Sequence, residues 1–159
     1  MRRGLALLLV SLTTVGCSWR VTPPTALDEP VAIIVVADKG RMPRVAAYLQ
    51  AALANTIPVR TGWRVRPDGT ARIELSVDSD QFGIFADDER SIPTIWRYTV
   101  RVSALLVCRQ GTRLHHCTGN GYAGSRATEP DAMRAAANEA GELVAQWLAQ
   151  VDLSPPQIP

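Results

Sequence analysis

The sequence predicts an α+β fold, a two-layer sandwich in which one mixed or antiparallel sheet of about four to five strands carries two helices on one face. Three observations predict it. A β-branched apolar run precedes a helical pattern, several segments then alternate between apolar and polar residues, and a long amphipathic pattern follows them. Because an alternating strand has one apolar face, two helices on that face are enough to cover the sheet.

The first two elements lie between residues 31 and 55. Val31–Ala37 is a continuous apolar and mostly β-branched run, which is typical of a strand buried on both faces. Met42–Asn55 has apolar residues at helical spacing. Ile57 and Pro58 are expected to end this helix, because a proline interrupts the helical hydrogen bonds.

Strands and turns are predicted from residue 63 to residue 122. Trp63–Arg66 is a short edge strand, and Pro67–Gly69 is the turn that closes it. Ala71–Val77 and Trp96–Cys108 alternate between apolar and polar side chains, with a loop between them. Leu114–Tyr122 is the hairpin partner of the second of these strands.

The last predicted element is a long helix that begins after Thr128. Thr128 is suited to cap its N-terminus, with Asp131 reaching back to it and Pro130 in the first turn, where a proline is tolerated. An apolar stripe predicts the face that packs on the sheet. It consists of Met133, Ala136, Ala137, Ala140, Val144, Trp147, Leu148 and Val151.

The first 17 residues are similar to a bacterial lipoprotein signal. Two arginines precede the short apolar run Leu5–Val10, and small residues lead to a Gly-Cys pair at Cys17, which indicates an export signal rather than a transmembrane helix. The pair resembles a lipobox, which implies that Cys17 receives diacylglycerol and palmitate and anchors the chain. The alternative is an ordinary secretory signal with a chance cysteine. In the lipoproteins that this signal resembles, a residue other than aspartate at the next position, here Ser18, implies transfer to the outer membrane.

One compact domain is expected, spanning residues 31–152. Residues 1–16 are the predicted signal peptide, 17–30 are the lipidated N-terminus and a proline-containing tether, and 153–159 are a proline-rich tail. Without the two arginines of the signal, the 17 basic residues fall to 15, against 15 acidic ones. This balance gives no basis for binding nucleic acid.

Export would place Cys108 and Cys117 in an oxidising compartment, where disulfides form. They flank Arg109–Arg113, a segment of hairpin length with a glycine. If the turn is centred near Thr112, the two cysteines face each other across the strands, close enough for a structural disulfide. A shift of one residue would put them on opposite faces and prevent the bond.

Two patterns resemble ligand-binding motifs but lack the surroundings that these motifs need. Gly119–Gly124 spells G-x-G-x-x-G before a helix, yet no strand follows to complete a dinucleotide-binding unit, so we interpret it as a bulged, flexible strand end. Asp78–Glu89 has the acid spacing of a calcium loop, but Phe82 occupies a ligand position. We therefore expect a solvated acidic loop there.

No metal site, cofactor or catalytic site is predicted. His115 and His116, with Cys108 and Cys117, could supply zinc ligands. Adjacent strand residues point to opposite faces, however, so the two histidines cannot both join Cys117 in one site without a bulge. The chain has no nucleophile elbow, no H-E-x-x-H motif and no recognisable pair of catalytic acids, so we expect no enzymatic activity.

Lys39 is the only lysine of the chain, and the planar guanidinium of the many arginines suits phosphate recognition. Five arginines at polar-face strand positions are candidates for contact with phosphate groups: Arg64, Arg66, Arg72, Arg97 and Arg101. On neighbouring strands they would make the open side of the sheet basic. The alternative is that they pair with Glu74 and Asp78 and are solvated, which contributes little at a surface.

The order and spacing of these elements over Val31–Val151 resemble the lipopolysaccharide-assembly lipoproteins, the LptE family. The stretches that carry the resemblance are VAIIVVADKG, IPVRTGWRV leading to ARIELSVDS, IWRYTVRVSALLVC, RQGTRL and DAMRAAANEAGELVAQWLAQV.

The resemblance implies a non-enzymatic, periplasm-facing lipoprotein of the outer membrane. Such a protein partners and plugs a large outer-membrane β-barrel of the lipopolysaccharide-translocon type, and contacts lipopolysaccharide through its phosphate oxygens. A second hypothesis is a periplasm-facing regulatory or secretion lipoprotein, resembling activators of cell-wall synthases or curli-secretion lipoproteins. Such proteins dock on an enzyme or form a ring, and predict a strand–helix–strand repeat toward the C-terminus that this sequence lacks.

Overall fold

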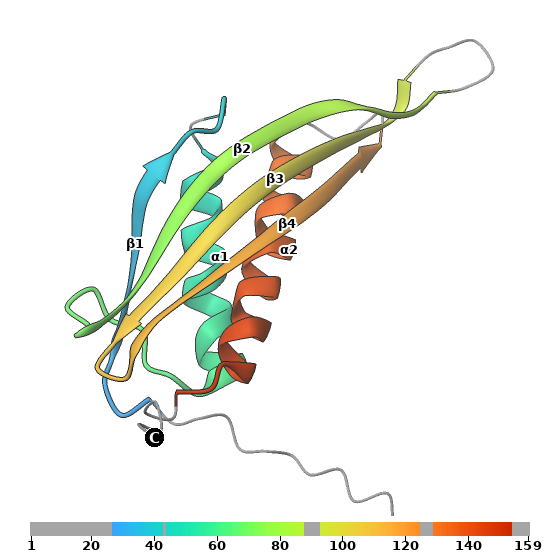
Figure 1. The fold of residues 1–159 in the computed structure, drawn as a ribbon. Coiled ribbons are helices and arrows are strands. Elements are labelled where there is room, and N and C mark those ends of the chain that lie inside the picture. Colours follow the sequence, from blue (N-terminus) through green and yellow to red (C-terminus); the bar gives the residue numbers. More distant parts are fainter. Residues whose placement is uncertain (1–26, 43, 88–92, 125–128, 154–159) are drawn as a thin grey trace, which may run out of the picture.

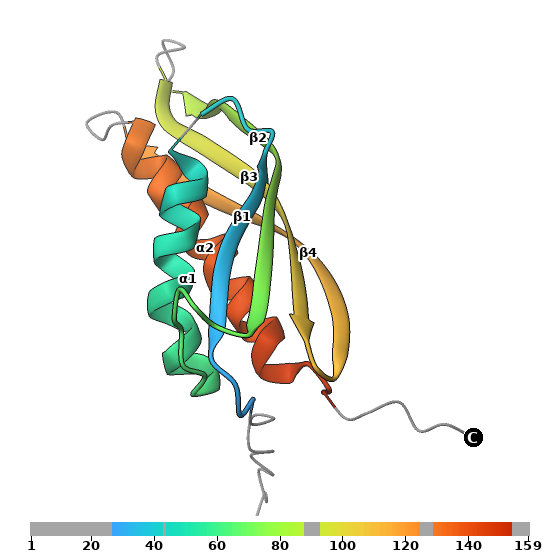
Figure 2. The same cartoon turned by 90° about the vertical axis from the view of Figure 1, so that its left-hand side faces the viewer.

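The computed structural model describes residues 27–42, 44–87, 93–124 and 129–153, and it confirms the predicted α+β architecture. One four-stranded sheet, in the order β1-β2-β3-β4, carries two helices on one face (Figure 1, Figure 2). The elements are β1 Val31–Asp38, α1 Val45–Thr61, β2 Ala71–Asp87, β3 Pro93–Cys108, β4 Gly111–Gly124 and α2 Glu129–Gln150. The predicted signal peptide, Cys17 and the cap Thr128 lie outside the described residues.

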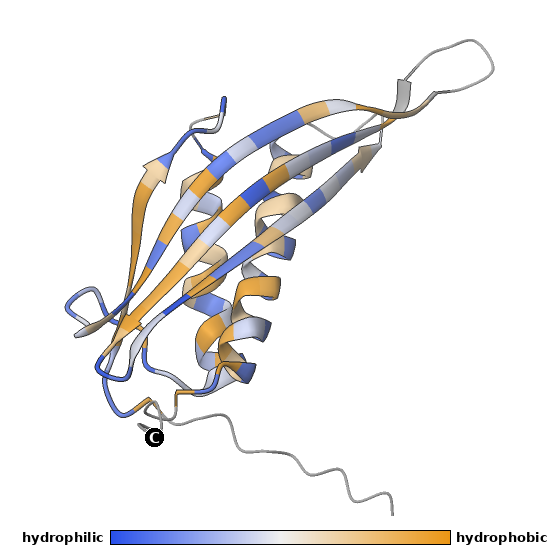
Figure 3. Ribbon diagram, viewed as in Figure 1, coloured by the Kyte–Doolittle hydropathy of each residue, from blue (hydrophilic) through white to orange (hydrophobic). Residues whose placement is uncertain are grey.

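The sheet is mixed, because β1 pairs with β2 in parallel while β2–β3 and β3–β4 are antiparallel. Apolar and polar residues alternate along β2 and β3 (Figure 3), and the apolar residues that face the helices are buried. Tyr98, Val100, Val102, Ala104 and Leu106 of β3 are buried as predicted. No helix in the described part of the chain has both the length and the hydrophobicity of a membrane span.

The prediction that β1 is buried on both faces is wrong. Val31 is buried, but Ile34 and Val36 are 38% and 56% exposed. The reason is that β1 is the edge strand of the sheet, and the helices cover one face of it. Its open face therefore presents apolar side chains.

Helix α1 does not end at Pro58 as predicted. It continues to Thr61 and ends at Gly62, whose φ of 73° is left-handed and whose N–H donates to the Pro58 carbonyl oxygen at 3.1 Å. Ile57 and Thr61 are buried. Their burial favours the last turn enough to offset the one hydrogen bond that the proline lacks.

The middle strands are longer than predicted. Residues 78–87, expected as an acidic loop, continue β2, because all of them except Asp78 and Phe85 pair with residues of β3, out to Asp87 and Pro93. The pairing of β2 with β3 shifts in register after Val77, after Ile84 and after Ala86. Glu89 of the suspected calcium pattern lies outside the described residues.

The glycines of β4 are not a bulged strand end, since β4 pairs with β3 without a register shift. A side chain at Gly119 would collide with the Ala136 carbonyl oxygen of α2, and one at Gly121 with that of Ala132. These glycines let the α2 backbone lie directly against the strand.

Candidate functional site

The candidate functional surface is the open face of the sheet, opposite the two helices (Figure 2). Strand register sorts its central side chains into rows that run across β2, β3 and β4. The rows are Ser79–Arg101–Thr118, Gln81–Thr99–Asn120 and Gly83–Arg97–Tyr122. The middle of this face is therefore polar and carries positive charge.

Three of the five predicted arginines lie on this face. Arg97 and Arg101 are exposed on β3, four residues apart. Arg72 is opposite Val107, six residues along β3 from Arg101, which corresponds to about 20 Å. Among the described residues none of the three forms an ion pair with Glu74 or Asp78.

The other two predicted arginines lie elsewhere. Arg64 and Arg66 flank Val65, which forms an isolated parallel bridge with Val31 beyond the free edge of β1. Arg66 forms an exposed 3.0 Å ion pair with Asp68. The five arginines thus do not form one patch.

The structure brings an arginine that the sequence prediction missed, Arg41, to the open face. Arg41 and Arg101 line one surface pocket of about 340 Å³, together with Ser79, Asp80, Gln81 and Thr99. Arg41 is the third residue after the end of β1, where β2 continues past the end of its parallel partner. The charged stretch Asp38–Arg41 after a buried run was the available signal, because loops at strand ends often carry binding residues.

Asp80 fixes the loop that holds Arg41. Its carboxylate accepts hydrogen bonds from the N–H of Arg41 at 2.7 Å and of Met42 at 3.1 Å, and from the Tyr98 hydroxyl. Burial by itself would raise the pKa of Asp80, but these hydrogen bonds outweigh it and the pKa is lowered. Burial and the Asp80 charge raise the pKa of Tyr98.

A serine, a histidine and an aspartate also meet on the open face. The Ser103 hydroxyl donates to Asp78 and lies 2.7 Å from His116 Nδ1. In a hydrolase triad the imidazole stands between the serine and the acid, and it takes the serine proton. Here the serine lies between the histidine and the acid, and its hydroxyl donates its hydrogen bond to the acid. This arrangement therefore does not activate Ser103.

The two histidines point to opposite faces of β4, as predicted. His116 contacts Ser103, while His115 stacks on Trp147 of α2 with 5.0 Å between ring centroids. Burial and the neighbouring His116 lower the pKa of His115. Within the described ranges no three His, Cys, Asp or Glu side chains come together as metal ligands would.

The predicted disulfide is wrong for this structure, because Cys108 and Cys117 are free thiols. The hairpin turn is Arg109–Gln110 rather than centred near Thr112, so Cys108 pairs with Gly111 and Cys117 with Val102. Six strand positions, about 20 Å, separate the two cysteines, whereas a disulfide needs Cα atoms within about 7 Å.

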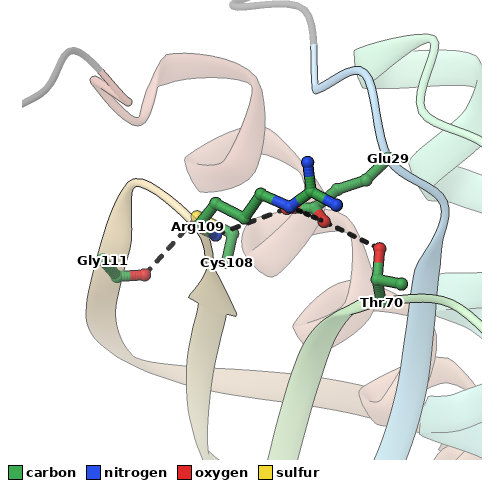
Figure 4. Close-up of polar contacts among 5 residues, drawn as sticks. All are labelled: Glu29, Thr70, Cys108, Arg109 and Gly111. Atoms are coloured by element: carbon green, nitrogen blue, oxygen red, sulfur yellow. Dashed lines mark hydrogen bonds and ion pairs between the residues drawn. The ribbon is translucent and has the colours of Figure 1, made fainter.

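The same hairpin turn is joined to the start of the domain, as Figure 4 shows. The Glu29 carboxylate accepts a 2.7 Å hydrogen bond from Thr70 and a 3.3 Å hydrogen bond from the Arg109 N–H, and lies 3.4 Å from Arg109 Nε. The Thr70 hydrogen bond is the main cause of the lowered pKa of Glu29. Burial acts in the opposite direction, and the hydrogen bond and charge of Arg109 lower the pKa further. The chain therefore enters the domain at the end of the sheet where β3 turns into β4 (Figure 1).

Comparison with known proteins shows a shared fold. No family model matches the sequence, and no curated protein is similar to it in sequence. PelC from Paraburkholderia phytofirmans, crystallised as a dodecamer in two crystal forms, superposes with TM-scores of 0.51 and 0.50 at 16% identity. The better superposition covers 76% of this chain and 87% of PelC. At this identity the similarity establishes the fold.

Two bacterial lipoproteins resemble the chain less closely. The minor lipoprotein of Acinetobacter baumannii has a TM-score of 0.47 at 13% identity, covering 75% of this chain and 92% of its own. Rare lipoprotein B of Shewanella oneidensis has a TM-score of 0.44 at 8% identity, covering 75% and 91%.

Proposed function

We propose that this chain is a non-enzymatic, LptE-like lipoprotein of the outer membrane. Anchored through Cys17, it faces the periplasm, partners and plugs a β-barrel of the lipopolysaccharide-translocon type, and assists lipopolysaccharide assembly. The observation that carries this proposal is the open sheet face, which the two helices leave uncovered and which presents Arg97 and Arg101. A sheet face with apolar and basic side chains is suited to pack against a partner that also has both.

Site-specific crosslinking in native envelopes tests this proposal. A photoreactive amino acid replaces Thr118, which is exposed on the open face, and in a matched variant Asn138, which is exposed on α2. We expect the variant at position 118 to capture a large outer-membrane β-barrel, and the variant at position 138 to capture far less of it. Equal capture from both positions, or no β-barrel from either, would contradict the proposal.

A second candidate is the regulatory or secretion-type lipoprotein, and the fold shared with the PelC dodecamer favours it. In that case the open face or an edge strand would contact further copies of the chain, or a cell-wall synthase. Crosslinks from position 118 between copies, with a ring-sized mass for the full-length protein in detergent, would favour a ring. Capture of a synthase would favour a regulator.

A further inference from the structure

We propose that the pocket between Arg41 and Arg101 binds a phosphate group, carried either by a glycolipid head group or by free phosphate. The inference rests on the proposed function for the biological source of the ligand, and it adds a defined site to it. The site replaces the broad arginine surface that the sequence predicts with two residues from different elements. One is on the loop after β1 and the other is in the middle of β3.

The two guanidinium groups line one pocket, and neither forms an ion pair with a carboxylate among the described residues. By contrast, Arg60, Arg66 and Arg109 pair with Glu142, Asp68 and Glu29. The two guanidinium groups outnumber Asp80, the carboxylate in the lining of this pocket, so an anion would neutralise the remaining positive charge and form charge-assisted hydrogen bonds with both arginines.

Asp80 is the acid in the lining of this pocket, and its oxygens are already engaged. They accept hydrogen bonds from the backbone N–H groups of Arg41 and Met42 and from the Tyr98 hydroxyl. The carboxylate thus holds the Arg41 loop through backbone hydrogen bonds. The Arg41 charge also helps to lower the pKa of Asp80, but the guanidinium forms no ion pair with this carboxylate. Asp80 is a positioning residue for this site.

The remaining lining residues fit a phosphate group that is part of a larger molecule. Ser79 and Gln81 add hydroxyl and amide donors to the pocket, while Thr99 donates its own proton to Asn120 at 3.1 Å. The next row contains Tyr122, which is 52% exposed and whose ring packs edge-on against Phe85. A sugar attached to the phosphate and extending across the sheet toward this row would meet an exposed aromatic residue.

Calorimetric titration of the full-length protein in detergent tests the site with three probes: inorganic phosphate, glucose 1-phosphate and glucose. We expect both phosphates to bind and glucose not to bind. Arg41→Gln and Arg101→Gln should each weaken binding of the phosphates roughly tenfold, the loss expected for one hydrogen bond to a charged group. Arg113→Gln is the control, because Arg113 lies near the hairpin turn opposite Leu106 and donates to the Thr112 carbonyl oxygen.

The relative affinities for the two phosphates distinguish the two sources of the phosphate group. Tighter binding of glucose 1-phosphate assigns the site to a sugar phosphate of a head group, and equal or tighter binding of inorganic phosphate assigns it to free phosphate. Absence of binding by both phosphates, or an equal loss in the Arg113→Gln control, overturns the proposal.

Amide chemical shifts of the unchanged protein give a readout that does not depend on the variants folding. Binding should shift the amides of Arg41, Ser79 and Thr99, and shifts confined to other regions would overturn the proposal. The titration uses the purified protein alone, so its failure is distinguishable from a failure to capture a β-barrel.

Discussion

Gly121 of β4 lies so close to the carbonyl oxygen of Ala132 in α2 that not even a methyl group would fit between them. Gly119 has the same relationship with Ala136, one turn further along the helix. This contact sets the distance between the sheet and α2, and backbone rather than a flexible side chain opposes any added atom.

Gly121→Ala should therefore destabilise the protein strongly, by about 2–4 kcal/mol, because the helix must move away from the strand and lose packing. Urea unfolding followed by circular dichroism measures the loss. The matched control is Gly124→Ala at the end of the same strand, where an added Cβ meets nothing within 4 Å. Similar stabilities for the two variants would show that the helix is free to shift.

The two cysteines should remain thiols in the folded protein even without reductant. Mass spectrometry of a non-reduced digest should show no peptide that joins Cys108 to Cys117. Burial, with a smaller effect of Glu139, raises the pKa of Cys117 to about 11. Alkylation of Cys117 should thus be slow at pH 8 and accelerate as the pH rises toward that value. Detection of the crosslinked peptide would mean that the hairpin has another register.

Asp80 should make the stability of the protein sensitive to acid. Its folded pKa is lowered, so its stabilising effect is present above the unfolded pKa of about 3.9 and is lost as the pH falls below that value. Asp80→Asn should lose roughly 1–3 kcal/mol at pH 7 and show a flatter dependence on pH below 4. Urea midpoints between pH 7 and pH 3 measure both effects.

Tyr98→Phe is the comparison for Asp80. It removes one hydrogen bond from the carboxylate but keeps the backbone N–H groups of Arg41 and Met42. The acid dependence should therefore persist in this variant. If Asp80→Asn retains the same acid dependence as the unchanged protein, another carboxylate is responsible.

Glu29→Gln should weaken the junction between the start of the domain and the β3–β4 turn. The Glu29 side chain is only 11% exposed, and Thr70 and Arg109 both donate to it. We expect a loss of roughly 0.5–1.5 kcal/mol in thermal or urea unfolding. Asp68→Asn provides the contrast, because both side chains of the Arg66–Asp68 pair are well exposed and such pairs contribute little.

Local sequence patterns predicted the kind of each element well. The alternation along β3 placed Tyr98 through Leu106 on the buried face, and the stripe from Met133 to Leu148 marked the packed face of α2. These patterns are reliable because the direction of a side chain depends on its own strand or helix and on nothing distant. The placement of both helices on one face of the sheet followed from these patterns, because each alternating strand has one apolar face.

The ends of the helices and strands were less predictable from the sequence, because they depend on pairing with segments that are distant in the chain. Residues 78–87 have the composition of a loop, yet pairing with β3 makes them strand. The open-face site shows the same limit. Arg97 and Arg101 could be named from their strand positions. Arg41 reaches the same face because β2 extends beyond the end of β1, and the sequence of a single segment does not reveal this.

The sequence by itself thus determined an α+β domain with one covered and one open sheet face, because hydrophobic periodicity is a local property of each segment. Tertiary structure alone decided the register of the β3–β4 hairpin, the separation of Cys108 from Cys117, and the meeting of Arg41 with Arg101. The physical reason is that register and loop position are set by packing between elements distant in the chain, where a shift of one residue exchanges the two faces of a strand.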